Sequence, residues 1–171
     1  MKTYLVDFEN VKSKGLAGIE RLGEDEKVVI FYSENSDTIT FDMHCAVMRA
    51  KAEIEYMKVR VGGKNALDFQ LSTLLGYIVA KGENTHIFII SNDKGFDRLH
   101  DFWNDTFDKR SECVVYRTVN IDAAVEYAKR KKPLSADNDR EEVRIELDKD
   151  CALTARIAAS AAAMIFFFVI N

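Results

Sequence analysis

The sequence predicts an α/β domain built on a central, mainly parallel sheet of about five strands with helices on both faces. Short apolar runs of strand length alternate along the chain with longer segments whose apolar residues recur at helical spacing. Two of the runs, 27–33 and 86–91, are largely apolar throughout, as in strands that are covered on both faces. At 171 residues, the chain has room for one such domain and a shorter appendage.

Each expected strand is followed by an expected helix. The strands are predicted at 3–7, 27–33, 53–59, 86–91 and 113–117, and the helices at 12–22, 39–51, 66–81, about 95–103, and 121–131. The helix at 66–81 has the strongest pattern, because leucines recur at helical spacing and Lys81-Gly82 supplies a stop signal. Strands and helices that alternate in this way favour right-handed crossovers and therefore a parallel sheet.

The composition divides the chain into three parts: a domain at 1–132, a charged linker at 133–150, and an apolar C-terminal helix at 151–171. Within 152–170 the only charged residue is Arg156. A helix of this length would extend about 28 Å, close to the ~30 Å hydrocarbon core of a bilayer. Two interpretations stay open: a membrane anchor with the body in the cytosol, or a helix packed on the domain or between copies in a homo-oligomer.

Charge and cysteine content exclude several classes of protein. Residues 1–133 carry 20 basic and 21 acidic side chains, so a purely electrostatic nucleic-acid binder is not expected. The three cysteines are odd in number and far apart, which argues against a disulfide framework and a zinc knuckle. Reduced cysteines of this kind are typical of a cytoplasmic protein.

Acidic residues follow several of the predicted strands. Asp7 ends the first strand, Asp93 follows the fourth with Asp97 one turn further, and Asp68 lies in the first turn of the helix at 66–81. The carboxyl ends of parallel strands form one binding edge, so these acids are expected to meet there. Clustered carboxylates repel one another unless a cation neutralises them, and oxygen ligands suit Mg²⁺ or Mn²⁺. Each acid alone also fits a helix-capping role.

Three segments resemble motifs of the NYN branch of the PIN-like nucleases. Asp7-Phe8-Glu9-Asn10 resembles the Asp-x-x-Asn start of that family, and residues 62–69 resemble its Lys-led segment, in which an acid opens a long helix. Residues 91–97, Ser-Asn-Asp-Lys-Gly-Phe-Asp, resemble its Ser-x-Asp-x-Asp-Phe motif. The similarity covers about residues 1–130, with the motifs in the family's order. It implies a three-layer, Rossmannoid PIN-like domain and a metal-dependent ribonuclease.

The same resemblance implies roles for individual residues. Asp7, Asp68 and Asp93 would be ligands of Mg²⁺ or Mn²⁺, and Asn10 would orient the site. Gly95 stands where the family often has a second acid.

Asp97 is expected to replace that missing acid as a fourth catalytic carboxylate and metal ligand, unless the site holds only one metal tightly. Lys64, Lys94 and Arg98 lie beside the acids and are expected to hold the phosphates of single-stranded or structured RNA.

Two alternatives stay open. The first is a catalytically degenerate PIN-like module that binds RNA or a protein, which Gly95 and the apolar C-terminal segment favour. The second is a haloacid-dehalogenase-like phosphatase, because Asp93 and Asp97 have the metal-ligand spacing of that family. Glu9 stands where the phosphatases need a second aspartate, and that argues against the second alternative.

Overall fold

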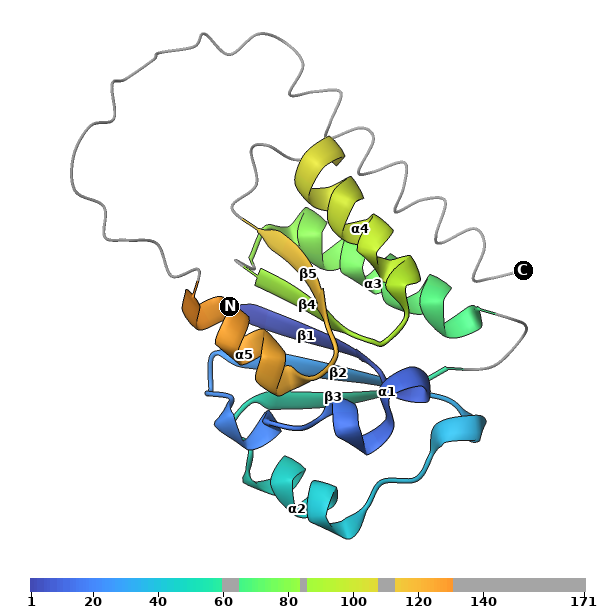
Figure 1. Cartoon of the computed structure of the whole chain (residues 1–171), viewed down its shortest axis with the longest axis vertical. Coiled ribbons are helices and arrows are strands. Elements are labelled where there is room, and N and C mark those ends of the chain that lie inside the picture. The colour runs from blue at the N-terminus through green and yellow to red at the C-terminus, as the bar shows by residue number, and fades with distance from the viewer. Residues whose placement is uncertain (60–64, 84–85, 108–112, 131–171) are drawn as a thin grey trace, which may run out of the picture. The chain divides into compact units, whose positions relative to one another are not determined.

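The computed structural model describes residues 1–59, 65–83, 86–107 and 113–130 (Figure 1). The predicted charged linker and apolar C-terminal helix therefore lie outside the described residues. Among the described residues, no helix combines the length and apolar character that a bilayer crossing needs.

Five parallel strands form a single sheet in the order β3-β2-β1-β4-β5. The strands are β1 (Lys2–Asp7), β2 (Glu26–Tyr32), β3 (Glu53–Lys58), β4 (His86–Ile90) and β5 (Val114–Thr118). The α-helices are α1 (Phe8–Gly15), α2 (Phe41–Arg49), α3 (Ala66–Lys81), α4 (Asp97–Asp101) and α5 (Ile121–Arg130). The predicted fold class is confirmed, with a sheet that is parallel throughout.

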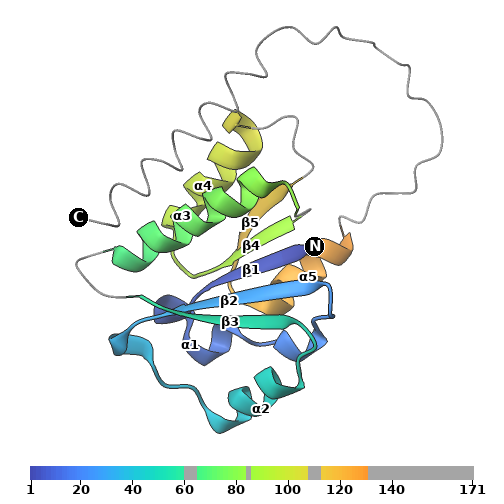
Figure 2. The ribbon, with the colours of Figure 1, turned by 180° about the vertical axis from the view of Figure 1, so that it is seen from behind.

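Helices cover both faces of the sheet and enclose two apolar cores (Figures 1 and 2). Successive side chains of a strand point to opposite faces, so Tyr4 and Val6 of β1 pack on one side and Leu5 on the other. The first core also contains residues of α1, α2 and α5. The second contains residues of α3 and Phe96 of the turn before α4, and Leu99 of α4 packs against it. Because β1 lies in the middle of the sheet, its side chains are buried on both faces.

The predicted first helix, at 12–22, is wrong in its boundaries. α1 begins at Phe8, directly after β1, because the Asp7 side chain accepts the backbone N–H of Asn10 and caps the helix there. Gly18 then adopts a left-handed conformation, and a separate 3₁₀ turn follows at Ile19–Arg21. Leu16, Ile19 and Leu22 are all buried, but only Ile19 lies within a helical element, whereas Leu16 follows α1 and Leu22 follows the 3₁₀ turn.

The predicted helix at about 95–103 is divided into three turns of different width. A 3₁₀ turn at Lys94–Phe96 leads into α4, and a π-helical segment at Phe102–Phe107 continues it. Asp93 caps the 3₁₀ turn by accepting the backbone N–H of Gly95.

Leu75 tests the packing of α3 on the sheet. Its side chain is 0% exposed and belongs to the second core. We expect Leu75→Ala to lower the free energy of unfolding by about 2–5 kcal/mol, because it removes buried methyl groups and leaves a cavity. Urea denaturation measures the loss.

The matched control is Phe41→Ala on α2, where the side chain is 87% exposed. This variant should change the free energy of unfolding by no more than about 0.5 kcal/mol. Equal losses in the two variants would contradict the burial of α3.

Candidate functional site

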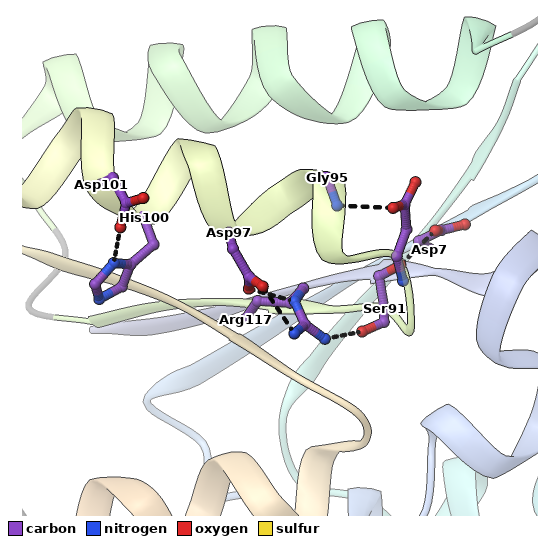
Figure 3. Close-up of polar contacts among 8 residues, drawn as sticks. Asp7, Ser91, Gly95, Asp97, His100, Asp101 and Arg117 are labelled. Carbon is purple, nitrogen blue, oxygen red and sulfur yellow. Dashed lines mark hydrogen bonds and ion pairs between the residues drawn. The ribbon is translucent and has the colours of Figure 1, made fainter.

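Asp7 and Ser91 meet where β1 and β4 end. The two strands pair in parallel with Val6 opposite Ile90, which brings the next residue of each strand side by side. The Ser91 hydroxyl donates a hydrogen bond to Asp7 Oδ2 at 2.8 Å, and its oxygen accepts the backbone N–H of Asp93 at 3.0 Å. Figure 3 shows Ser91 beside Asp7. One hydroxyl therefore connects two of the predicted acids.

A cavity of about 660 Å³ opens at this edge of the sheet. Three predicted metal ligands line it, and they come from β1, from the first turn of α3 and from the turn after β4. The lining residues are Asp7, Glu9, Asn10, Asn35, Val59, Asn65, Ala66, Leu67, Asp68 and Asp93. The structure thus brings together Asp7, Asp68, Asp93 and Asn10.

Glu9, Asn35 and Asn65 also line the cavity and were not among the predicted site residues. Glu9 lies inside the Asp7–Asn10 motif, so its acidity was a usable signal. Asn65 precedes α3 with a positive φ of 68°, a conformation that asparagine tolerates better than most residues. Asn35 lies in a turn after β2 that carries no comparable pattern.

Burial and the charges of neighbouring carboxylates raise the pKa values of Asp7 and Asp68. Asp7 is 3% exposed, and this burial raises its pKa, while hydrogen bonds from Ser91 and Asn10 partly counteract the rise. The charges of Asp68 and Glu9 raise the pKa of Asp7 further. Partial burial raises the pKa of Asp68, and the charges of Asp93 and Glu9 add to the rise. The cavity therefore concentrates negative charge that a bound cation would relieve.

The donor set fits a hard divalent cation. The polar side chains that line the cavity are carboxylates and amides, which offer oxygen ligands. In the part of the chain that the structure describes, no three His, Cys, Asp or Glu side chains come close enough to form a complete ligand set. Mg²⁺ tolerates this, because it usually keeps several waters and takes only one or two protein carboxylates.

Asp97 is not brought to the cavity. Arg117 on β5 donates from Nε to Asp97 Oδ1 at 2.6 Å and from Nη2 to Oδ2 at 3.1 Å. Its Nη1 donates to the Ser91 carbonyl oxygen at 3.0 Å (Figure 3). Hydrogen bonding from Arg117 lowers the pKa of Asp97. Asp97 thus anchors the turn at 91–97 to β5.

Gly95 has a structural role in the same turn. Its backbone N–H donates to Asp93 Oδ1 at 2.7 Å, and a Cβ atom at this position would lie 3.1 Å from the same oxygen. A side chain at residue 95 would therefore crowd the Asp93 carboxylate. The glycine lets Asp93 fold back onto its own turn and leaves Oδ2 of that carboxylate for other contacts.

Two of the predicted phosphate-binding residues, Lys94 and Arg98, do not line the cavity. Lys94 and Arg98 are exposed, on the 3₁₀ turn and on α4. Lys64 lies outside the described residues. Their contact with RNA stays a prediction.

A family model described as PIN domain matches residues 1–112. The matched range contains every residue that lines the cavity. No curated protein and no solved structure matches the chain significantly.

The variant Asp7→Asn tests whether the ionised Asp7 carboxylate destabilises the metal-free fold. An amide can keep both contacts, since its oxygen accepts the Asn10 N–H and its nitrogen donates to the Ser91 hydroxyl. Because folding raises the pKa of Asp7, the ionised carboxylate destabilises the fold above that pKa. Without metal, we expect Asp7→Asn to raise the free energy of unfolding at pH 7 by about 0.5–2 kcal/mol.

The pH dependence has a definite sign. The gain should be full above the raised pKa of Asp7 and should vanish below its ordinary value of 3.8, where both states are protonated. Thermal unfolding in chelator across this range measures it. Asp101→Asn, at an exposed carboxylate on α4, is the control and should give no comparable gain. A lower free energy of unfolding for Asp7→Asn at pH 7 would contradict a destabilising effect of the Asp7 charge.

The variant Arg117→Lys tests the anchor of the turn. Lysine keeps the charge but cannot donate two parallel hydrogen bonds to Asp97 together with one to Ser91. We expect a loss of about 1 kcal/mol in the free energy of unfolding at pH 7, modest because Asp97 is half exposed.

The loss should fade with acid, because a carboxylate with a lowered pKa stabilises the fold only while it is ionised. Urea denaturation at pH 7 and below the pKa of Asp97 provides the comparison. Arg98→Lys, at an exposed neighbour on α4, is the matched control. A loss that persisted unchanged in acid would argue against the ion pair as its cause.

Proposed function

The chain belongs to the PIN domain family, and from this premise we propose that it is a metal-dependent ribonuclease that hydrolyses RNA phosphodiester bonds. The fold is nuclease-like. The observation that carries the proposal is the convergence of Asp7, Asp68 and Asp93 on one cavity, where burial and then neighbouring carboxylates raise the pKa values of Asp7 and Asp68. An acidic cluster with one buried member, Asp7, is costly for folding and is typical of a functional site.

Asp7, Asp68 and Asp93 would hold Mg²⁺ or Mn²⁺, one or two of them directly and the rest through bound waters. Such an ion lowers the pKa of a bound water and stabilises the leaving oxygen of a phosphodiester. The chain's own contribution is orientation, because Ser91 and the Asn10 N–H each hold one oxygen of the Asp7 carboxylate. The Gly95 N–H does the same for Asp93.

The amide side chains of the cavity suit the substrate. Asn10, Asn35 and Asn65 each carry an NH₂ group that can donate to a phosphate oxygen or a ribose hydroxyl. Lys94 and Arg98 are exposed on the elements that follow Asp93, where they would hold flanking phosphates. In this proposal the site resembles that of the NYN branch in Asp7, Asn10, Asp68 and Asp93.

A second candidate is a PIN-like module that binds RNA without cutting it. Two observations favour it: glycine occupies position 95, and the Asp97 carboxylate is engaged by Arg117. The turn at 91–97 therefore supplies the cavity with one carboxylate, Asp93, where the family motif would supply two. Metal-dependent cleavage separates the two candidates.

The test is cleavage of a mixed pool of single-stranded and structured RNA by the full chain, with Mn²⁺, with Mg²⁺ and with chelator. We expect cutting only with metal. Asp93→Asn and Asp68→Asn should each lower the rate by at least ~100-fold. Loss of a residue that only supports a metal ligand already costs about 10- to 100-fold, and loss of a ligand itself should cost no less.

Asp101→Asn, an exposed carboxylate on the same side of the sheet, is the control and should cut normally. Cutting that survives chelator would contradict the proposal. An absence of cutting with Mn²⁺ binding and RNA binding both intact would favour the non-cutting module.

A further inference from the structure

The exposed face of α3 carries aromatic rings where a surface helix usually carries charges. Within α3 the exposed residues are Phe69, Thr73, Tyr77, Ala80 and Lys81. The Phe69 side chain is 71% exposed and that of Tyr77 57%. The Thr73 hydroxyl donates to the Phe69 carbonyl oxygen at 2.8 Å, so its methyl group is left to the surface. The helix between the two rings therefore carries Thr73 on its exposed face and no charged residue.

This row of side chains begins at the acidic cavity. Asn65 lines the cavity and lies one helical turn before Phe69, whose backbone N–H it accepts at 3.1 Å. Positions 65, 69, 73, 77 and 81 form an i, i+4 ridge. At 1.5 Å per residue the ridge extends about 24 Å from the cavity wall. Figure 2 shows the whole length of α3 from the side, and the helix begins near the ends of β1 and β2.

The far end of the ridge is cationic. The Lys81 ammonium lies 4.9 Å from the centroid of the Tyr77 ring. Aromatic rings that stack on bases, next to cations that hold the backbone, are how proteins bind single-stranded nucleic acid. The two rings are separated by two helical turns, about 12 Å along the axis. They are therefore placed for bases at different positions of one strand.

A protein partner fits the ridge less well. Helices that dock into a partner's groove present apolar anchors at positions i, i+3, i+4 and i+7. The α3 ridge, defined as Asn65, Phe69, Thr73, Tyr77 and Lys81, has two large apolar side chains, which lie eight residues apart. The exposed apolar residues around α2, in contrast, include Met48 and Ile39 beside Phe41. Continuity with the cavity and the terminal cation distinguish the α3 ridge from that surface.

We propose that the α3 ridge binds the single-stranded RNA that leads into the acidic cavity, with one base stacked on Phe69, another on Tyr77, and a phosphate beside Lys81. The inference rests on the proposed function and adds to it the surface that holds the strand outside the cavity. Bases of an A-form duplex are stacked on one another and cannot stack on the ridge, whereas bases of a single strand can. The ridge therefore selects a strand that is unpaired where it crosses α3.

The test is equilibrium binding of a fluorescently labelled, single-stranded oligoribonucleotide of about 12 nucleotides to the full chain. Chelator is present, so that the proposed nuclease does not cut. We expect Phe69→Ala and Tyr77→Ala each to weaken binding roughly tenfold, as loss of a stacking ring does at other single-strand sites. Phe69→Leu should be as weak as Phe69→Ala, because leucine keeps apolar area but not a flat ring.

Two controls separate stacking from other effects. Phe41→Ala removes a ring that is 87% exposed on the opposite side of the sheet and should bind RNA as the unchanged chain does. An abasic strand of the same length should bind equally to the unchanged chain and to Phe69→Ala. Since both ridge rings are exposed, all variants are expected to fold, and circular dichroism checks this.

Several outcomes would overturn the proposal. They are unchanged affinity in both alanine variants, absence of RNA binding by the unchanged chain, and full binding by Phe69→Leu. A fourth is a change from dimer to monomer in Phe69→Ala with unaltered RNA affinity, which would assign the ridge to a second copy of this chain.

The cleavage assay is independent of the binding assay. If the unchanged chain never cuts RNA with Mn²⁺ but Phe69→Ala still loses RNA binding, the ridge stands and the proposed function fails. If the unchanged chain cuts and Phe69→Ala cuts with the same KM, the ridge proposal fails while the proposed function stands.

Discussion

The parallel pairing of β1 with β4 is the constraint on which the site depends. It places Asp7 next to Ser91, 84 residues further along the chain, and the Ser91 hydroxyl then links Asp7 to the turn that carries Asp93. The register of β1 cannot slip, because its residues are buried on both faces and a shift by one would exchange Tyr4 and Leu5 between the two cores. Packing of the two apolar cores therefore fixes the strand register that brings Asp7 within hydrogen-bond distance of Ser91.

The same arrangement has an electrostatic cost. Burial of Asp7 raises its pKa, and the Ser91 and Asn10 hydrogen bonds offset the effect only in part. Asp68, on a different element, is affected in the same direction by Asp93 and Glu9. The two groups therefore make the metal-free fold less stable as pH rises through their raised pKa values. A fold selected for stability alone would avoid this cluster, whereas one that binds a cation there recovers the cost on binding.

The fold and three acids of the cavity were predictable from sequence because their signals are local. A strand that ends in Asp7 and a helix with Asp68 in its first turn can both be read within a few residues. The ion pair that keeps Asp97 out of the cavity was not predictable. Its partner Arg117 lies 20 residues away on β5, and only the pairing of β4 with β5 brings the two side chains together. Apolar spacing does not reveal the start of α1, because the Asp7 cap determines where that helix begins.

The turn at 91–97 shows how the site is held with fewer acids than the motif it resembles. It is attached to β1 through the Ser91 hydroxyl and to β5 through Arg117, so both ends of the turn are fixed by neighbouring strands. Between these points Gly95 supplies a backbone N–H to Asp93, where a second acid would have added a charge. One carboxylate fewer means weaker attraction for a cation and weaker repulsion of RNA phosphates. In a domain whose charge is nearly balanced, an aromatic ridge beside the cavity would then supply binding energy that electrostatics does not.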